Sequence, residues 1–461
     1  MRFEHELTLP YPRDQVFAWH ERPGAFMRLT PPSFGRVVQE PSDGIRDGSI
    51  AILRLAIPGT VGTAGLQFTA QHSGYDPPVK FEDSMIGGPV KEWHHTHRFI
   101  DAPANGTMIR DEIDFELPSL AIGPAATIGE RVALQQLSRL WAFRDRQLAF
   151  DLDFHSRHTT PKTIAVTGAT GMVGTQLVAF LRGGGHDVRR VVRTAARGRD
   201  ISWDPARGTL DVEQLRDVDV VIHLAGAPIG RRFTAKHKKA VRDSRIDGTR
   251  LIADALATLA QDGRPRALIS ASASGYYGAD PGDEVLTEDR APGDGFLADL
   301  CRDWEAACQP ARDAGVRVVN VRTGLVQSAA GGQLGIQAPL FRLGAGGPLG
   351  SGNQWMPWIA LEDLIGIYAH AALHDDLYGP VNAVAPGIVR NADYADALAQ
   401  VLHRPAFLKV PRIGPAMLFG ADGADEFVMA GQRMSAAKIE TAGYRFGYPE
   451  LVGALGHALA R

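Results

Sequence analysis

Apolar residues in the second part of the chain form short runs that alternate with amphipathic or polar segments. The clearest runs cover residues 188–192, 218–224, 267–271 and 316–321. Such runs are typical of strands buried on both faces, and their alternation with helices is typical of a doubly wound parallel sheet. We therefore predict a Rossmann-type α/β domain over 162–386, followed by a C-terminal helical segment on the substrate side over 391–461.

The first 153 residues follow a different pattern. Five segments separated by clusters of Pro, Gly, Asp and Asn predict strands over 2–9, 49–57, 65–74, 92–100 and 107–117. Two short helices are expected over 12–20 and 24–29, and a long helix over 125–150 carries apolar residues at helical spacing. These elements predict a separate α+β domain over 1–153. The polar stretch 155–162 is the expected linker.

Composition narrows the functional class. The chain has 461 residues, of which 44% are apolar and 22% charged, and a formal net charge of −3. Nothing in this balance favours nucleic acid or an anionic membrane as a partner, and no apolar run reaches membrane-spanning length. With two cysteines and no signal-peptide pattern, the expected location is the cytoplasm. The oligomeric state is left open.

A glycine-rich segment after the apolar run 163–166 is the strongest chemical motif. It contains Gly168, Thr170, Gly171, Met172, Val173 and Gly174, and a helical pattern follows. Glycines allow a tight turn and a close approach of phosphates, and the N–H groups and dipole of a helix start attract the negative charge. We therefore predict a dinucleotide site here.

The end of the next predicted strand indicates which dinucleotide binds. Sites that prefer NAD place an acidic residue near this point to hold the ribose 2′-hydroxyl, whereas this chain has Arg193. A guanidinium pairs with a 2′-phosphate through two hydrogen bonds, so NADP(H) is the expected cofactor; the alternative is an arginine that only solvates a loop. Leu224, Ala225 and Gly226 are expected to lie against the adenosine side of the cofactor, or else to allow tight strand-to-helix packing.

These motifs together resemble those of the extended short-chain dehydrogenase/reductases, the NAD-dependent epimerase/dehydratase superfamily, over about residues 162 to 450. The resemblance is greatest to its atypical "epimerase family protein" subfamily, which has a C-terminal domain of unknown function. The matching segments are 167–174, 221–228, 243–250, 270–278, 296–298, 304–305, 322–324, 346–352 and 358–359. The resemblance implies cofactor contacts from Gly168, Gly171, Met172, Val173, Gly174, Arg193, Leu224, Ala225 and Gly226.

The N-terminal domain resembles the helix-grip fold of the START/polyketide-cyclase-like (SRPBCC) superfamily. The resemblance rests on the order of its elements and on the opening segment 9–17. It implies a curved sheet that wraps the last helix around an apolar cavity, so an apolar ligand is expected in this domain.

The chain departs from the superfamily at the usual catalytic pair. Ordinary members use a Tyr and a Lys four residues apart on one helix face; the lysine lowers the tyrosine pKa, and the tyrosine moves a proton while hydride passes to or from the nicotinamide. Aligned on Glu305, these positions hold Leu297 and Cys301, and Arg245 stands where Asn is usual. Neither Leu297 nor Cys301 can perform that chemistry.

Replacement groups are expected at the C-terminal edge of the sheet. Ser272 lies near the expected hydroxyl position, and Tyr276 or Tyr277 is placed to donate a proton; the alternative is a half-buried aromatic with a satisfied hydroxyl. We take Ser272 and Tyr277 as the candidate catalytic residues. Arg245 is expected either to contact the cofactor or a substrate anion, or to solvate a helix face.

Two further groups of polar residues received simpler interpretations. His95 and His97, beside His94, fall on one strand face, but a zinc site needs a third ligand and the spacing shows none, so no metal is expected. Glu305 is expected to share a solvated helix face with the neighbouring acidic residues 299 and 303.

The sequence thus predicts an NADP-dependent oxidoreductase that acts on an unidentified, hydrophobic carbonyl or alcohol. Two alternatives stay open. One is a nucleotide-sugar epimerase or dehydratase, which the absence of the usual Tyr/Lys pair disfavours. The other is a non-catalytic NADPH-binding regulator with a lipid-sensing N-terminal domain, which the same absence supports.

Overall fold

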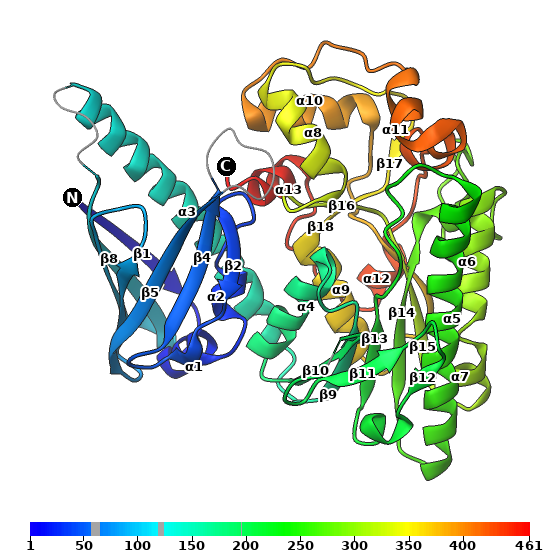
Figure 1. Ribbon diagram of the computed structural model, residues 1–461, viewed down its shortest axis with the longest axis horizontal. Helices are drawn as coiled ribbons and strands as arrows, with labels where there is room; N and C mark the ends of the chain where they lie inside the picture. The colour runs from blue at the N-terminus through cyan, green and yellow to red at the C-terminus, as the bar shows by residue number, and fades with distance from the viewer. Residues whose placement is uncertain (57–64, 119–123, 195) are drawn as a thin grey trace. The chain divides into compact units, whose positions relative to one another are not determined.

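The computed structural model describes residues 1–56, 65–118, 124–194 and 196–461, and the chain forms two compact units (Figure 1). Unit 1 comprises Met1–Thr159, Ala179–Gly185 and His457–Arg461, and unit 2 comprises Thr160–Val178 and His186–Gly456. Ile57, the last residue of the predicted strand 49–57, lies outside the described residues.

Unit 1 is built on a seven-stranded antiparallel sheet in the order β1-β8-β7-β6-β5-β4-β2. Its strands are β1 (Arg2–Leu9), β2 (Gly35–Gln39), β4 (Ile50–Ala56), β5 (Gly65–Asp76), β6 (Lys80–Gly87), β7 (Glu92–Ala102) and β8 (Gly106–Glu116), with the short β3 (Ser42–Ile45) beside them. All five strands predicted for this unit form. The sequence pattern missed β2, β3 and β6; in β6 the acidic Asp83 lies on the inward face and breaks the alternation.

The helices of unit 1 pack against this sheet. Helices α1 (Arg13–Glu21) and α2 (Ala25–Arg28) form near the predicted positions, and α3 (Pro124–Ser156) is the long final helix. Because α3 continues to Ser156, the expected start of the linker at His155 was wrong. Apolar side chains fill much of the space between α3 and the sheet, in one cluster around Phe17, Phe99 and Leu152 and another around Ile113, Phe115 and Trp141.

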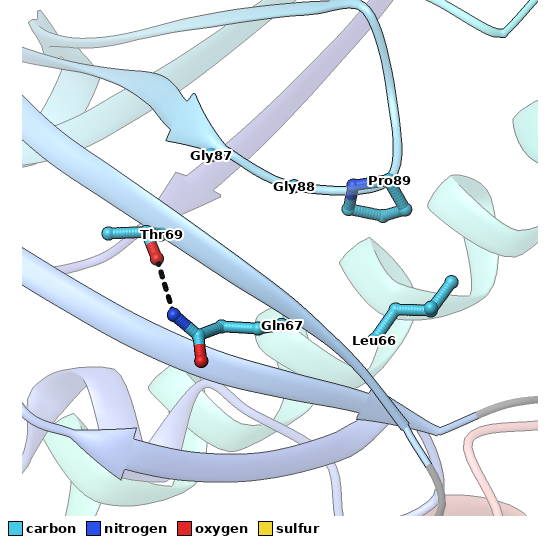
Figure 2. Close-up of a pocket in the computed structure, with 6 residues that line it drawn as sticks. All are labelled: Leu66, Gln67, Thr69, Gly87, Gly88 and Pro89. Atoms are coloured by element: carbon cyan, nitrogen blue, oxygen red, sulfur yellow. Dashed lines mark hydrogen bonds between the residues drawn. The ribbon is translucent and has the colours of Figure 1, made fainter.

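A hollow of about 300 Å³ lies elsewhere in unit 1, where β5 begins and β6 ends (Figure 2). It is lined by Leu66, Gln67, Thr69, Gly87, Gly88 and Pro89. The amide of Gln67 donates a hydrogen bond to the hydroxyl of Thr69 at 3.2 Å, so the lining is partly polar. The apolar ligand expected for this unit stays a prediction.

Unit 2 contains an eight-stranded sheet in the order β12-β11-β10-β9-β13-β14-β15-β19. Its strands are β9 (Thr163–Thr167), β10 (Asp187–Val192), β11 (Ile201–Asp204), β12 (Thr209–Leu210), β13 (Val220–His223), β14 (Ala267–Ala273), β15 (Arg317–Thr323) and β19 (Gly379–Ala383). Neighbours are parallel except β11 and β12. The predicted doubly wound sheet is confirmed, and its strand order reverses between β9 and β13, where such sheets bind ligands.

Helices cover both faces of this sheet (Figure 1). One face carries α5 (Ala235–Leu259), α6 (Phe296–Ala306) and α7 (Gln309–Asp313), and the other carries α4 (Met172–Gly183) and α9 (Leu361–Leu373). The remaining elements are β16 (Leu325–Gln327), α8 (Gly332–Arg342), β17 (Trp355–Met356), β18 (Trp358–Ala360), β20 (Val389–Arg390), α10 (Asn391–Leu402), α11 (Ile413–Gly423), α12 (Ala437–Thr441) and α13 (Leu451–Ala458). The helical C-terminal segment is confirmed. Within the described ranges, no helix is long and apolar enough to span a bilayer.

A buried carboxylate fastens the C-terminal segment to α9. Asp363 is fully buried and accepts hydrogen bonds from the N–H groups of Gly447 and Tyr448, at 2.8 and 2.9 Å, and from the hydroxyl of Tyr444 at 3.0 Å. Burial raises the pKa of Asp363 to about 7, while the three hydrogen bonds act in the opposite direction and favour its charged form. One side chain of α9 thus holds the chain between α12 and α13.

Replacing Asp363 with Ala should therefore destabilise unit 2. It takes the carboxylate acceptor away from the N–H groups of Gly447 and Tyr448, while the Tyr444 hydroxyl can still donate to the main-chain carbonyl of residue 363 at 3.1 Å. We expect a loss of about 3 kcal/mol in the free energy of unfolding, measured by urea denaturation. The matched control is Asp376→Ala, at an exposed aspartate just after α9, which should change stability by less than about 0.5 kcal/mol. Equal losses in the two variants would contradict the anchoring role.

Candidate functional site

The turn between β9 and α4 has the geometry of a phosphate cradle. Gly168 has a φ of +66°, and a Cβ there would lie 2.9 Å from the backbone nitrogen of Ala225. A Cβ on Gly174 would lie 2.2 Å from the carbonyl oxygen of Gly168. The start of α4 therefore lies closer to the end of β9 than any residue type other than glycine at position 174 would allow. A Cβ on Gly171 would meet only that same oxygen, at 3.3 Å. The fold therefore requires the first and third glycines, whereas the middle one borders open space.

The start of α4 offers unused donors at this turn. The N–H of Gly171 donates to the carbonyl of Gly168 at 3.0 Å. In the described chain, no acceptor takes the N–H groups of Met172, Val173 or Gly174. Such N–H groups and the positive end of the helix dipole favour an anion.

A buried hydroxyl holds the end of β13 against the cradle. The Oγ1 of Thr167 accepts hydrogen bonds from the N–H groups of Leu224 and Ala225, both at 3.1 Å, and lies 2.8 Å from Nδ1 of His223. Burial, reinforced by the charge of Arg245, lowers the pKa of His223 to about 4. The ring is therefore neutral, and its Nδ1 accepts a hydrogen bond from the Thr167 hydroxyl. This arrangement brings Leu224 and Ala225 against Gly168, and their contact with the cofactor stays a prediction.

Arg245 of α5 lies beside Gly226. Its Nη1 donates to the carbonyl oxygens of Ala227 and Val241, at 3.0 and 3.2 Å, and its guanidinium carbon lies 4.9 Å from the ring centroid of Trp304. Burial lowers the pKa of Arg245. The Arg245 side chain therefore holds the loop after β13 in place. This role differs from the solvated helix face that was one of the alternatives from the sequence.

Arg193 leaves the sheet at the same edge as the cradle. Val191 of β10 pairs with Thr167 of β9, so Arg193, just after β10, follows Val191 at the edge where Gly168 follows Thr167. Nearby acidic side chains are engaged elsewhere, as in the ion pair between Arg190 and Asp200 at 2.6 Å. Arg193 is exposed, and no ion pair in the described ranges involves it.

The structure brings the candidate catalytic residues Ser272 and Tyr277 into one hydrogen-bond network around Arg322. Ser272 Oγ donates to Glu305 Oε1 at 2.7 Å. Arg322 donates to both oxygens of Glu305, at 2.9 and 3.0 Å, and to the hydroxyl of Tyr277 at 3.0 Å. The Tyr277 hydroxyl in turn donates to Asn382 Oδ1 at 2.7 Å.

This network engages the two hydroxyls within the protein. Burial raises the pKa of Tyr277 to about 12. Burial alone would lower the pKa of Arg322, but the hydrogen bonds to Glu305 raise it above its usual value. The geometry favours a satisfied hydroxyl on Tyr277 over a proton donor. The ring of Tyr276 lies 3.4 Å from the guanidinium carbon of Arg322.

Glu305 was assigned wrongly from the sequence. Its side chain is only 13% exposed and forms the ion pair with Arg322, so it does not share a solvated helix face. Periodicity in α6 does not show the partner, which lies on β15. The available signal was that both residues fall in segments that match the resembled family.

The positions of the usual Tyr/Lys pair are filled by packing residues. Leu297 and Cys301 of α6 are 8% and 2% exposed. A Cβ on Gly275 would lie 3.1 Å from the Cβ of Leu297, so this helix rests directly on the turn after β14. Burial raises the pKa of the Cys301 thiol to about 12. Neither position carries a proton-transfer group or a cation.

The histidines of unit 1 have a third partner that the sequence spacing did not show. Asp83 on the neighbouring strand β6 brings a carboxylate oxygen close to His95 and His97, with one donor atom of each residue within 4.8 Å of the others. The absence of a third ligand was therefore a wrong expectation, because the ligand comes from strand register and not from local spacing.

Three family patterns match the chain. The family described as NAD dependent epimerase/dehydratase matches residues 164–383, a domain of unknown function matches 410–458, and the family described as polyketide cyclase/dehydrase and lipid transport matches 9–143. The first two fall in unit 2 except for residues 179–185 and 457–458, and the third falls in unit 1.

Relatives match at substantial identity. An epimerase family protein of Mycobacterium bovis is 42% identical over 300 residues, which are 65% of this chain and 98% of the relative. A solved nucleoside-diphosphate sugar epimerase from Corynebacterium glutamicum has a TM-score of 0.81 at 36% identity, covering 100% of this chain and 90% of that one. The human epimerase family protein SDR39U1, solved with NADPH, has a TM-score of 0.58 at 33% identity, over 64% of this chain and 99% of that one.

The Arg322 network yields a stability prediction. Glu305→Ala leaves the guanidinium of Arg322, 2% exposed, without its carboxylate, and should reduce the free energy of unfolding by about 3–5 kcal/mol. Ser272→Ala removes one hydrogen bond from the same network and should cost about 1 kcal/mol. Urea denaturation of both variants checks the difference; a Glu305→Ala loss no larger than the Ser272→Ala loss would contradict it.

Proposed function

Because the chain belongs to the NAD dependent epimerase/dehydratase family, we propose that unit 2 binds NADP(H) and transfers hydride between its nicotinamide and a small carbonyl or alcohol substrate. The observation that carries the proposal is the cradle: unused N–H groups at the start of α4 border the open space beside Gly171. The pyrophosphate would occupy that space.

The phosphorylated cofactor is proposed on the basis of Arg193. This exposed arginine follows β10 at the position where NAD sites place a carboxylate, and it has no ion pair in the described ranges. A guanidinium there pairs with a 2′-phosphate through two hydrogen bonds. The human relative solved with NADPH supports the same choice.

The substrate is proposed to be hydrophobic. Apolar side chains on α8, α11 and the loop before α11 are exposed, and these are Ile336, Leu340, Phe407, Leu408, Ile413, Met417 and Leu418. Exposed apolar groups of this extent are typical of binding surfaces.

Both cysteines are buried free thiols, which supports our placing the protein in the cytoplasm.

A second candidate is a non-catalytic NADPH-binding regulator. The hydroxyls of Ser272 and Tyr277 are engaged within the protein, and Leu297 and Cys301 fill the usual catalytic positions. Ser272 and Tyr277 stay predictions as catalytic residues. The Corynebacterium glutamicum relative makes nucleoside-diphosphate sugars a further substrate class to test.

Replacement of Arg193 tests the cofactor choice. Arg193→Asp should weaken NADPH binding by about 1–3 kcal/mol and leave NADH binding nearly unchanged, because a charged hydrogen bond to the 2′-phosphate is lost. Fluorescence titration measures both affinities. Arg207→Asp, at an arginine that is 83% exposed, is the control and should alter neither. Equal losses for NADPH and NADH would remove Arg193 from this role.

Single-turnover kinetics test the reaction. Bound NADPH should be oxidised by at least one member of a panel of carbonyl compounds that includes hydrophobic ketones and nucleoside-diphosphate sugars. Gly171→Val is the matched control. A Cβ there meets only the carbonyl oxygen of Gly168, at 3.3 Å, a tight contact that a small shift relieves, and the side chain fills the cradle, so the variant should fold and bind neither cofactor. Tight NADPH binding without oxidation by any compound would support the regulator instead.

A further inference from the structure

A buried cluster of imidazoles and carboxylates lies in unit 1, on the face of the sheet that contacts α3. Its members are Asp83 of β6, His95 and His97 of β7, and Asp111 of β8. Asp83 lies opposite His95, and Asp111 lies opposite His97, in the strand register. The ring of Trp141 on α3 lies 5.4 Å from that of His95. The proposed function of unit 2 does not use these residues.

Each imidazole bridges the two carboxylates. His95 places Nδ1 at 3.1 Å from Oδ2 of Asp83 and Nε2 at 3.2 Å from Oδ1 of Asp111. His97 places Nε2 at 3.6 Å from the same Asp83 oxygen and Nδ1 at 2.6 Å from the same Asp111 oxygen. One nitrogen of each ring therefore faces Asp83, while Asp111 holds the other nitrogen.

Two tryptophans orient the carboxylates. Trp93 Nε1 donates to Oδ1 of Asp83 at 3.2 Å, and Trp141 Nε1 donates to Oδ2 of Asp111 at 2.7 Å. Each carboxylate thus keeps its other oxygen directed at the imidazoles. Metal-binding histidines in proteins are held in this way, with the outer ring nitrogen bonded to a carboxylate.

The donor atoms on the Asp83 side are spaced for a metal ion. Around a tetrahedral zinc ion with bonds of about 2.0–2.1 Å, ligand atoms lie about 3.3 Å apart. The Asp83 oxygen lies 3.1 Å from the His95 nitrogen and 3.6 Å from the His97 nitrogen, and one donor atom of each residue lies within 4.8 Å of the others. Small side-chain adjustments would bring all three into contact with one ion.

Charge favours the same conclusion. Asp83 and Asp111 bring two carboxylates into the interior, where charge is costly unless it is balanced. The nearby guanidinium of Arg144 directs Nε to the carbonyl of Leu29 at 3.2 Å and lies over the ring of Trp141. No hydrogen bond between Arg144 and either carboxylate occurs in the described ranges. The positive charge of Arg144 acts on both carboxylates from a distance, and a divalent cation would balance the negative charge that remains.

We propose that Asp83, His95 and His97 bind a divalent first-row transition cation, with Asp111 orienting both imidazoles. Two histidines and one carboxylate form a ligand set of zinc and of ferrous iron. Three protein ligands leave coordination positions for water or for a donor atom of a small molecule, which is typical of catalytic and not of structural sites.

Metal titration of the full-length, untagged, chelator-treated protein tests the proposal. Zn²⁺, and Fe²⁺ without oxygen, should bind at one equivalent per chain by elemental analysis after desalting, and Zn²⁺ should raise the Tm. His97→Gln and Asp83→Asn should lose the equivalent. His94→Gln, on the same strand with a side chain 47% exposed, should keep it. Asp111→Asn keeps the ligands and should bind about 10- to 100-fold more weakly.

Two outcomes would overturn the site. The first is that the wild-type protein binds no metal, in which case the cluster is an ion-pair network. The second is that His97→Gln still binds one equivalent of metal per chain. If the ligand variants do not fold, Co²⁺ added to the wild-type chain decides: visible absorption of tetrahedral cobalt supports the site, and the spectrum of hydrated cobalt overturns it. Neither result depends on cofactor binding in unit 2.

Discussion

The missing side chain of Gly174 is the constraint on which the dinucleotide fold depends. Any Cβ there would overlap the carbonyl of Gly168, so only glycine lets α4 begin directly beside the end of β9. That approach places the free N–H groups of the helix at the edge of the sheet. The hydroxyl of Thr167 then holds the end of β13 at the same edge, where the proposed cofactor would lie.

The sequence predicted features that arise from neighbouring residues and missed those that arise from strand register. The cradle and the buried strands of unit 2 follow from local patterns, because each glycine or apolar run acts within a few residues. The partners of Glu305 and His95 were missed, since Arg322 and Asp83 lie on other strands. An isolated acidic residue on an amphipathic strand or helix has no local signature of a buried partner.

The same distinction applies to the candidate catalytic residues. Loss of the Tyr/Lys pair is evident from α6 alone, and the structure shows that Leu297 and Cys301 are packed, with no room for a substrate atom between helix and turn. Ser272 and Tyr277, in contrast, donate hydrogen bonds to residues that are distant in the sequence, Glu305 and Asn382. The local sequence pattern shows neither of these two partners.

Asp363 has a consequence for protein engineering. Its carboxylate lies on α9, before the C-terminal segment, but its donors lie near residue 447, inside that segment. A chimaera joined at residue 391, which exchanges the segment between relatives as a cassette, would separate the acceptor from its donors unless the incoming piece supplied the same three groups. Recombination designed to change substrate preference should therefore cross over before α9, or should preserve this aspartate together with its recipient loop.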